Sequence, residues 1–270
     1  MWTLGGFFHS SRLTFLICAA ALASSCEDEI DSTPSPDEVA RWASEVHVSV
    51  AGTRLSAPLI SIFIQEQDRE PEWREPKTRF ELGARGGNAD EPIVAKFVQL
   101  NFRTYGKHNG YEKICPLLTR QWSMSVCKDA WSFARRSLPE SFYLAAPFEE
   151  HSYQRVSLAG GGDLTAPSVP PSSDRPVYSC TTWSAGEICM ASVLAANGLV
   201  ATWTVNETKN ETTYDQIQRQ GAAIVAFTKF AIGPQEDFEA LTDALCKLRN
   251  PDDKSHEGRD DPCENGKAGE

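Results

Sequence analysis

The stretch CTTWSAGEICMASVLAANGLVATWTV, residues 180–205, decides the fold, and the block that it opens continues to Cys246. Apolar residues recur on both sides of Asn197-Gly198, a pair typical of a two-residue hairpin turn. Such a turn places Leu194 opposite Ala201 and Met190 opposite Val205. The sequence therefore predicts a hairpin whose apolar face contains Met190, Leu194, Leu199, Ala201, Trp203 and Val205.

An amphipathic helix is expected after the hairpin, over residues 213–232. Thr213 and Gln216 have the spacing of a capping box at its start, and Gly233-Pro234 stops it. A second helix is expected over residues 236–248. The core-facing stripe of the first helix is predicted from its spacing to contain Tyr214, Ile217, Gly221, Ile224 and Thr228.

Shorter strands are expected before this block, because β-branched and apolar residues alternate between turn-forming clusters. Pro58 indicates that the second strand lies at a sheet edge, or breaks its start. The predicted fold is α+β, with an antiparallel sheet of several short strands packed on C-terminal helices and stapled by about three disulfides. The expected strands are Val46–Val50, Leu55–Ile64, Ile93–Phe102, Ser141–Ala145 and Tyr153–Leu158.

The N-terminus has the order of an export signal. Arg12 precedes the apolar run of residues 13–23, which is too short to span a bilayer. Cleavage before Ser24 would leave seven cysteines, whereas cleavage before Cys26 with acylation of that residue would leave six that can all pair. Parity therefore favours a lipoprotein anchored through Cys26, although the lipobox is imperfect because Ala23 stands where Leu is usual.

The remaining six cysteines form three pairs of neighbours along the sequence. Short loops between such neighbours close readily during oxidative folding. We expect disulfides within each neighbouring pair. A zinc site is the alternative, and it is disfavoured because the chain has no C-x-x-C or H-x-x-x-H spacing and export favours oxidation. No metal or other cofactor is expected. The predicted pairs are Cys115 with Cys127, Cys180 with Cys189, and Cys246 with Cys263.

Composition divides the chain into four parts. Residues 1–25 are the export signal, and residues 26–41 are expected to form a flexible acidic tether because they hold little to bury. Residues 42–250 are expected to form a single α+β domain, and residues 251–270 a polar tail. A division of the domain at the glycine- and proline-rich residues 160–176 is the alternative.

The net charge of the chain limits the kinds of molecule that it is expected to bind. The chain carries 26 Lys plus Arg against 37 Asp plus Glu, a net charge of −11, and removal of the signal with Arg12 gives 25 against 37, or −12. This balance disfavours nucleic acid, whose phosphates would be repelled. It is compatible with a basic protein partner and also with solubility alone. A hydrophobic content of 41% excludes intrinsic disorder of the whole chain.

A catalytic constellation is not evident in the sequence. Ser184, His108 and His151, with Asp163 as an acid, are the residues from which a Ser/His hydrolase could be assembled. No G-x-S-x-G elbow accompanies them. No catalytic residue is therefore assigned.

The expected function is binding of a protein partner by an exported, membrane-anchored protein of the periplasm or outer envelope. Its concrete form is an inhibitor or immunity protein that neutralises a secreted toxin. The alternatives are a periplasmic hydrolase with an unrecognised Ser/His site and a structural surface lipoprotein. We expect the functional surface in the loops at residues 181–187 and 206–212, beside the hairpin.

Overall fold

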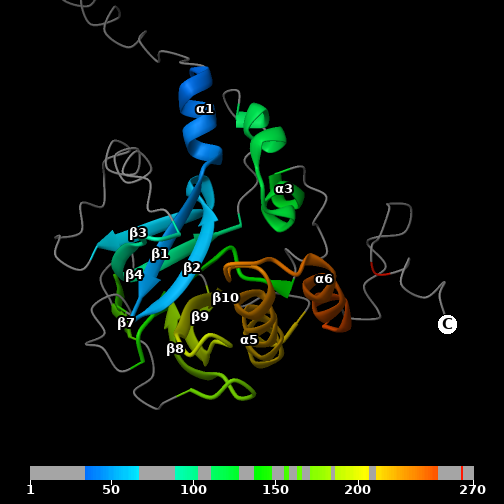
Figure 1. Ribbon diagram of the computed structural model, residues 1–270. Helices are drawn as coiled ribbons and strands as arrows, with labels where there is room; N and C mark the ends of the chain where they lie inside the picture. The colour runs from blue at the N-terminus through cyan, green and yellow to red at the C-terminus, as the bar shows by residue number, and fades with distance from the viewer. Residues whose placement is uncertain are drawn as a thin grey trace, which may run out of the picture. The chain divides into compact units, whose positions relative to one another are not determined.

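The computed structural model describes residues 34–66, 89–102, 111–127, 137–147, 155–157, 163–165, 171–183, 186–206, 211–248 and 263. Within these residues the chain alternates short helices and strands (Figure 1). The elements before the segment at 160–176 are α1 (Pro36–Ala43), β1 (Glu45–Val50), β2 (Thr53–Pro58), η1 (Leu59–Ser61), β3 (Ile62–Glu66), β4 (Ile93–Asn101), η2 (Tyr111–Leu117), α3 (Gln121–Cys127), β5 (Ser141–Ala145) and β6 (Arg155–Ser157). The later elements are β7 (Asp163–Thr165), β8 (Val177–Trp183), β9 (Gly186–Leu194), β10 (Val200–Asn206), α5 (Thr213–Phe230) and α6 (Phe238–Lys247).

One eight-stranded sheet contains most of the strands, in the order β2-β1-β4-β5-β10-β9-β8, with β3 also paired to β4. All of its pairs are antiparallel except β1 with β4. β6 and β7 form a separate two-stranded sheet. The predicted α+β class, with C-terminal helices on a largely antiparallel sheet, is confirmed.

Strands from both sides of residues 160–176 belong to the same sheet. β5 precedes that segment and β10 follows it, and the two strands pair through Val200 with Ala145 and Thr202 with Tyr143. The described strands therefore give no division of the sheet at this segment.

The hairpin of β9 and β10 forms, but its predicted register is wrong by one residue. Ala195 donates its N–H to the carbonyl of Leu199 at 2.7 Å, and Gly198 donates to Ala195 at 3.1 Å. The loop thus has three residues and ends in Gly198 at φ 82°, the left-handed position of a bulged turn. Ala201 consequently lies opposite Val193 instead of Leu194.

This shift exchanges the two faces of β9, because side chains alternate along a strand. Ala191 and Val193 share the main core with Trp203, whereas Met190 and Leu194 lie on the opposite face. The prediction for β10 holds, since Ala201, Trp203 and Val205 are all buried in that core.

Helix α5 packs on β9 and β10. Its N-cap is Thr212, whose side chain accepts from the N–H of Asp215 at 3.1 Å, so the predicted cap at Thr213 is wrong by one residue. Ile217, Ile224 and Phe227 are fully buried, as the helical spacing predicts. Tyr214, also predicted to face the core, is instead 55% exposed.

An aromatic cluster joins α3 and α5 to the sheet. Phe227 of α5 lies 5.0 Å from Trp122 of α3 and 4.9 Å from Phe102, measured between ring centroids. Phe102 stacks on Phe142 of β5 at 5.6 Å. These edge-to-face and stacked contacts add to the burial of large apolar rings, so the helices are held firmly on this face.

Two further expectations are corrected near the N-terminus. Residues 36–41, expected to be part of a flexible tether, lie in α1, because Ser35 and Glu38 form a capping box and Val39 and Trp42 are buried. Residues 26–33 lie outside the described chain. The predicted strand over residues 55–64 is two strands, β2 and β3, separated by η1 directly after Pro58.

Candidate functional site

All six cysteines beyond Cys26 pair as predicted. Disulfides join Cys115 to Cys127, Cys180 to Cys189, and Cys246 to Cys263. Such bonds persist in oxidising, exported compartments. Among the described helices, none is long and apolar enough to cross a membrane. Cys26 and the signal segment lie outside the described residues.

The residues considered for a hydrolase are not brought together by the described structure. Ser184, His108 and His151 lie outside the described residues. Asp163 is the first residue of β7, but its side chain is also outside the description. A Ser/His site therefore stays an untested alternative.

One group of metal-ligand types occurs among the described residues, formed by Cys180, Glu187 and Cys189 within 4.8 Å of one another. Both sulfurs are bonded to each other, however. Metal binding by cysteine needs thiolates, so this group is a cross-strand disulfide with an adjacent carboxylate.

The most elaborate polar cluster is built around Arg120, whose side chain is 6% exposed. Its guanidinium donates to the carboxylate of Glu45, with Nε to Oε1 at 2.9 Å, and to the carbonyls of Ala231 and Gly233, both at 2.9 Å. Ser56 donates to the same carboxylate. We call these five residues the Arg120 clamp; it connects β1, β2 and the segment between α5 and α6.

Burial acts to raise the pKa of Glu45, but the hydrogen bonds from Ser56 and Arg120, with the charge of Arg120, outweigh it and lower the pKa below its usual value. Glu45 is therefore an ionised partner of Arg120 at neutral pH. Its oxygens are used by Ser56, Thr119 and Arg120. A carboxylate held this way stabilises the fold.

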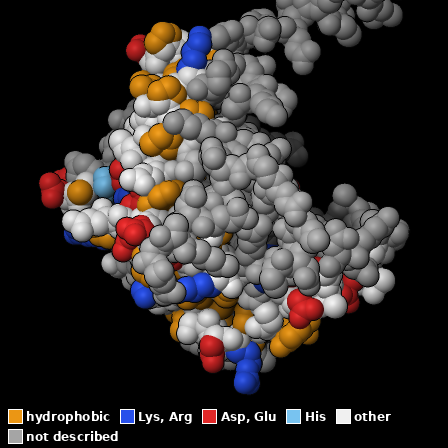
Figure 2. Space-filling view, turned by 90° about the vertical axis from the view of Figure 1, so that its right-hand side faces the viewer, with side chains coloured by type: hydrophobic (Ala, Val, Ile, Leu, Met, Phe, Trp, Pro, Cys, Tyr) orange, Lys and Arg blue, Asp and Glu red, His pale blue; other side chains and the backbone are white. Residues whose placement is uncertain are grey.

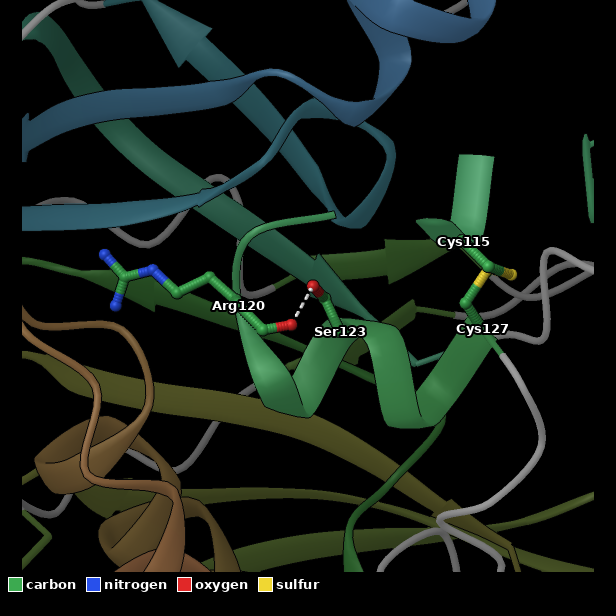
Figure 3. Close-up of a disulfide and its surroundings, with 4 residues drawn as sticks. All are labelled: Cys115, Arg120, Ser123 and Cys127. Atoms are coloured by element: carbon green, nitrogen blue, oxygen red, sulfur yellow. Dashed lines mark hydrogen bonds between the residues drawn. A yellow bond between two sulfur atoms is a disulfide. The ribbon is translucent and has the colours of Figure 1, made fainter. Parts of the chain in front are cut away.

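Helix α3 is anchored by the same region. Glu236 accepts the N–H groups of Gln121 and Trp122, each at 2.8 Å. Ser123 donates to the carbonyl of Arg120 at 2.8 Å, and the Arg120 side chain extends away from the Cys115–Cys127 disulfide (Figure 3). These contacts place Arg120 for the clamp, so its role is structural.

The clamp lies beside the β2 end of the sheet, and this edge is covered. Ser56 donates its N–H to the carbonyl of Ile232 at 2.9 Å, which occupies a main-chain donor outside the β1–β2 ladder. Leu55, Ser56 and Ala57 are each 3% exposed or less. β2 is thus shielded from a further strand.

At the opposite end of the sheet, no described strand pairs with the outer edge of β8, although β7 lies close to both β8 and β9. Within the described chain β8 pairs with β9 alone, and five consecutive residues, 178–182, are exposed. Its sequence VYSCTTW contains no charged residue and no proline, the usual devices that protect an edge strand. Uncharged, exposed edges are templates for pairing with another chain.

Two exposed tyrosines lie next to this edge. Tyr178 of β8 and Tyr214 of α5 are 43% and 55% exposed, and their ring centroids are 6.4 Å apart at an interplanar angle of 63°. Exposed tyrosines combine large apolar area with a polar hydroxyl and are enriched at protein interfaces. The sequence analysis missed both residues, although Tyr178 lies three residues before its predicted surface loop and Tyr214 two residues after the other.

Charged residues occur in α5 and in the β8–β9 ladder, the elements that carry or adjoin the tyrosine pair. Asp215 follows Tyr214 in the first turn of α5, and Glu187 lies opposite Thr182 in the β8–β9 ladder. Glu211 is neutralised by Arg219 through hydrogen bonds of 2.9 and 2.6 Å. Figure 2 presents another view, the side of the molecule on the right of Figure 1, where acidic, basic and hydrophobic side chains are interspersed among the coloured residues.

Comparison of the chain with protein-family models, curated proteins and solved structures found no match. The function must therefore be argued from the geometry of the described residues.

Proposed function

We propose that this protein binds another protein in the envelope of a bacterium, held at the membrane by lipid on Cys26. The single observation that supports it best is the exposed pair Tyr178 and Tyr214 beside the uncovered strand β8. Exposed aromatic rings that lie next to each other are typical of surfaces that bind other proteins.

A basic partner suits the charge of the chain. The net charge of −11 attracts cationic proteins over long range and speeds their association. The polar groups of the Arg120 clamp are hydrogen-bonded to one another within the protein. Binding of a partner at the surface beside β8 therefore explains the described residues better than catalysis does.

In its concrete form the protein is an inhibitor or immunity protein that neutralises a secreted toxin. Such a protein must persist outside the cytoplasm and capture its target quickly. Three disulfides serve the first need, and opposite charge serves the second.

Photo-cross-linking in the exported protein tests the proposal. A photoreactive residue replaces Tyr178 or Tyr214, with Val94 as a matched control because it is also exposed, at 57%, on β4. We expect a covalent adduct with a basic exported protein from positions 178 and 214 and none from position 94. Absence of any adduct at both tyrosine positions would contradict a binding role for this surface.

The anchor has its own measurement. Mass spectrometry of the mature N-terminus should show a diacyl- or triacylglyceryl modification on Cys26. An unmodified mature chain beginning at Ser24 would overturn the anchor while leaving the binding proposal intact.

A further inference from the structure

We infer that the partner binds by strand addition: an extended segment with Lys or Arg at alternate positions pairs with the outer edge of β8. This inference rests on the proposed binding function and specifies its mode. The sheet would then grow by one strand at its uncovered end, next to Tyr178 and Tyr214.

Main-chain geometry supplies the hydrogen bonds for strand addition. Cys180 and Cys189 are directly opposite, with Cα atoms 4.0 Å apart. That separation fits a non-hydrogen-bonded antiparallel pair, about 4.5 Å, and not a hydrogen-bonded pair, about 5.5 Å. The N–H and C=O of Cys180 therefore point away from β9. By alternation the same holds for Tyr178 and Thr182, and we call these three residues the open edge.

Side chains on one face of the open edge select the partner's chemistry. Cys180 bonds to Cys189, which belongs to the core beneath α5, so Tyr178 and Thr182 share that face. The ring contact between Tyr178 and Tyr214 of α5 agrees with this placement. Alternate side chains of an added strand would therefore meet the two tyrosine rings.

Basic side chains fit that environment best. Lys and Arg lay their aliphatic stems on aromatic faces and bring the cation within about 6 Å of a ring. Acidic side chains at the same positions would be repelled by the net charge of −11.

A second copy of this chain is the competing occupant. The open edge is uncharged, so two copies could pair along it. Each copy carries a net charge of −11, however, so two copies repel each other. Charge complementarity therefore favours a basic partner over self-association.

The test uses a pair of variants at Thr182. Thr182→Pro removes an outward N–H without taking a hydrogen bond from the β8–β9 ladder, and Thr182→Ala removes the same side chain while keeping the N–H. The probe is a pool of capped peptides of about six residues in which Lys or Arg alternates with Val, Ile or Thr. Affinity is measured by calorimetry, and folding by thermal unfolding and circular dichroism.

We expect the peptides to bind the wild type, to bind T182P about tenfold more weakly, and to bind T182A within about twofold. Equal binding to both variants, or no binding to the wild type, would overturn strand addition. Self-association that T182P abolishes, measured by sedimentation, would replace the partner by a second copy. If T182P unfolds, Tyr178→Pro takes its place with Tyr178→Ala as control, because both variants lose the ring and only the proline variant also loses an outward N–H.

Failure of the mode and failure of the function give different results. Cross-links at positions 178 and 214 that persist in T182P would retain the binding function and reject strand addition. Absence of cross-links at positions 178 and 214 in the otherwise wild-type protein would reject both the binding function and strand addition.

Discussion

The two terminal strands of the sheet are treated in opposite ways. β2 is buried, donates Ser56 N–H to Ile232, and is held beside the Arg120 clamp. β8 has five exposed residues in succession, and its described pairing is with β9 alone. An uncovered edge strand is a template for association with another chain, so the two ends of the sheet differ in their capacity to bind a partner.

The difference between the two edges indicates that one end of the sheet stabilises the fold and the other is available for binding. At the β2 edge, a buried charge and main-chain hydrogen bonds fix the α5–α6 segment on the sheet. At the β8 edge, the aromatic side chains Tyr178 and Tyr214 remain in solvent. Substitutions should therefore lower stability strongly at the Arg120 clamp beside β2 and only weakly at the exposed residues of β8.

The largest effect is expected from Arg120→Met. It leaves the Glu45 carboxylate and the carbonyls of Ala231 and Gly233 without their donor, and should lower the free energy of unfolding by about 3 kcal/mol. Urea denaturation measures the change. Arg175→Met, at an exposed position before β8, should change it by less than about 0.5 kcal/mol. Equal effects of the two variants would erase the contrast between the edges.

Gly221→Ala should have the next largest effect. An added Cβ would lie 2.6 Å from Cγ of Pro176, the buried residue directly before β8, and 3.5 Å from the Trp203 ring. This overlap should cost about 2 kcal/mol despite the better helix propensity of Ala.

Gly233→Ala is the matched control for Gly221→Ala, because its Cβ would meet nothing closer than 3.6 Å. Urea denaturation should show little change in its stability. A stable Gly221→Ala protein would mean that α5 does not hold the start of β8 as closely as the geometry indicates.

The pH dependence of stability tests the clamp more finely. Burial acts to raise the pKa of Glu45, but hydrogen bonds from Ser56 and Arg120 outweigh it and leave the pKa below its usual value of 4.5. The folded pKa is therefore lower than the unfolded one, so its stabilisation is present above pH 4.5 and is lost as the pH falls through the folded pKa.

Comparison with Glu45→Gln isolates this carboxylate from the others. Urea denaturation at pH values between about 3 and 7 should show the wild type losing its advantage over the variant on acidification. A constant difference across that range would show that the ionisation of Glu45 does not stabilise the clamp.

The smallest effect is expected from Tyr178→Ala. The ring is 43% exposed and its described ring contact is with Tyr214, so thermal unfolding should show a loss of about 0.5 kcal/mol. Phe142→Ala, at a fully buried ring, should cost about 3 kcal/mol or more. A comparable loss at Tyr178 would make it a core residue and remove the basis of the binding surface.

Local sequence patterns predicted much of the fold. The disulfide neighbours, the strand at Ser141–Ala145 and the helices α5 and α6 all follow from spacing over a few residues. The errors lie where one residue changes the outcome. The bulge at Gly198 adds a residue to the turn and so exchanges the faces of β9.

The candidate surface was less accessible to sequence reasoning. Tyr214 has helical spacing with buried residues, yet it lies in the first turn of α5, where its ring meets Tyr178 on the exposed terminal strand β8. The clamp joins Glu45 to Arg120 across 75 residues, a distance that no local pattern reports. Edge position is likewise a property of strand order, which the sequence periodicity of β8 does not contain.

Amide hydrogen exchange at the two edges, read residue by residue, tests the central contrast most directly. We predict protection of Ser56, whose N–H is bonded to Ile232, and alternation along β8: Ser179 and Thr181 protected by β9, and Tyr178, Cys180 and Thr182 exchanging rapidly. Uniform protection along β8, or rapid exchange at Ser56, would contradict the account of one covered and one open edge.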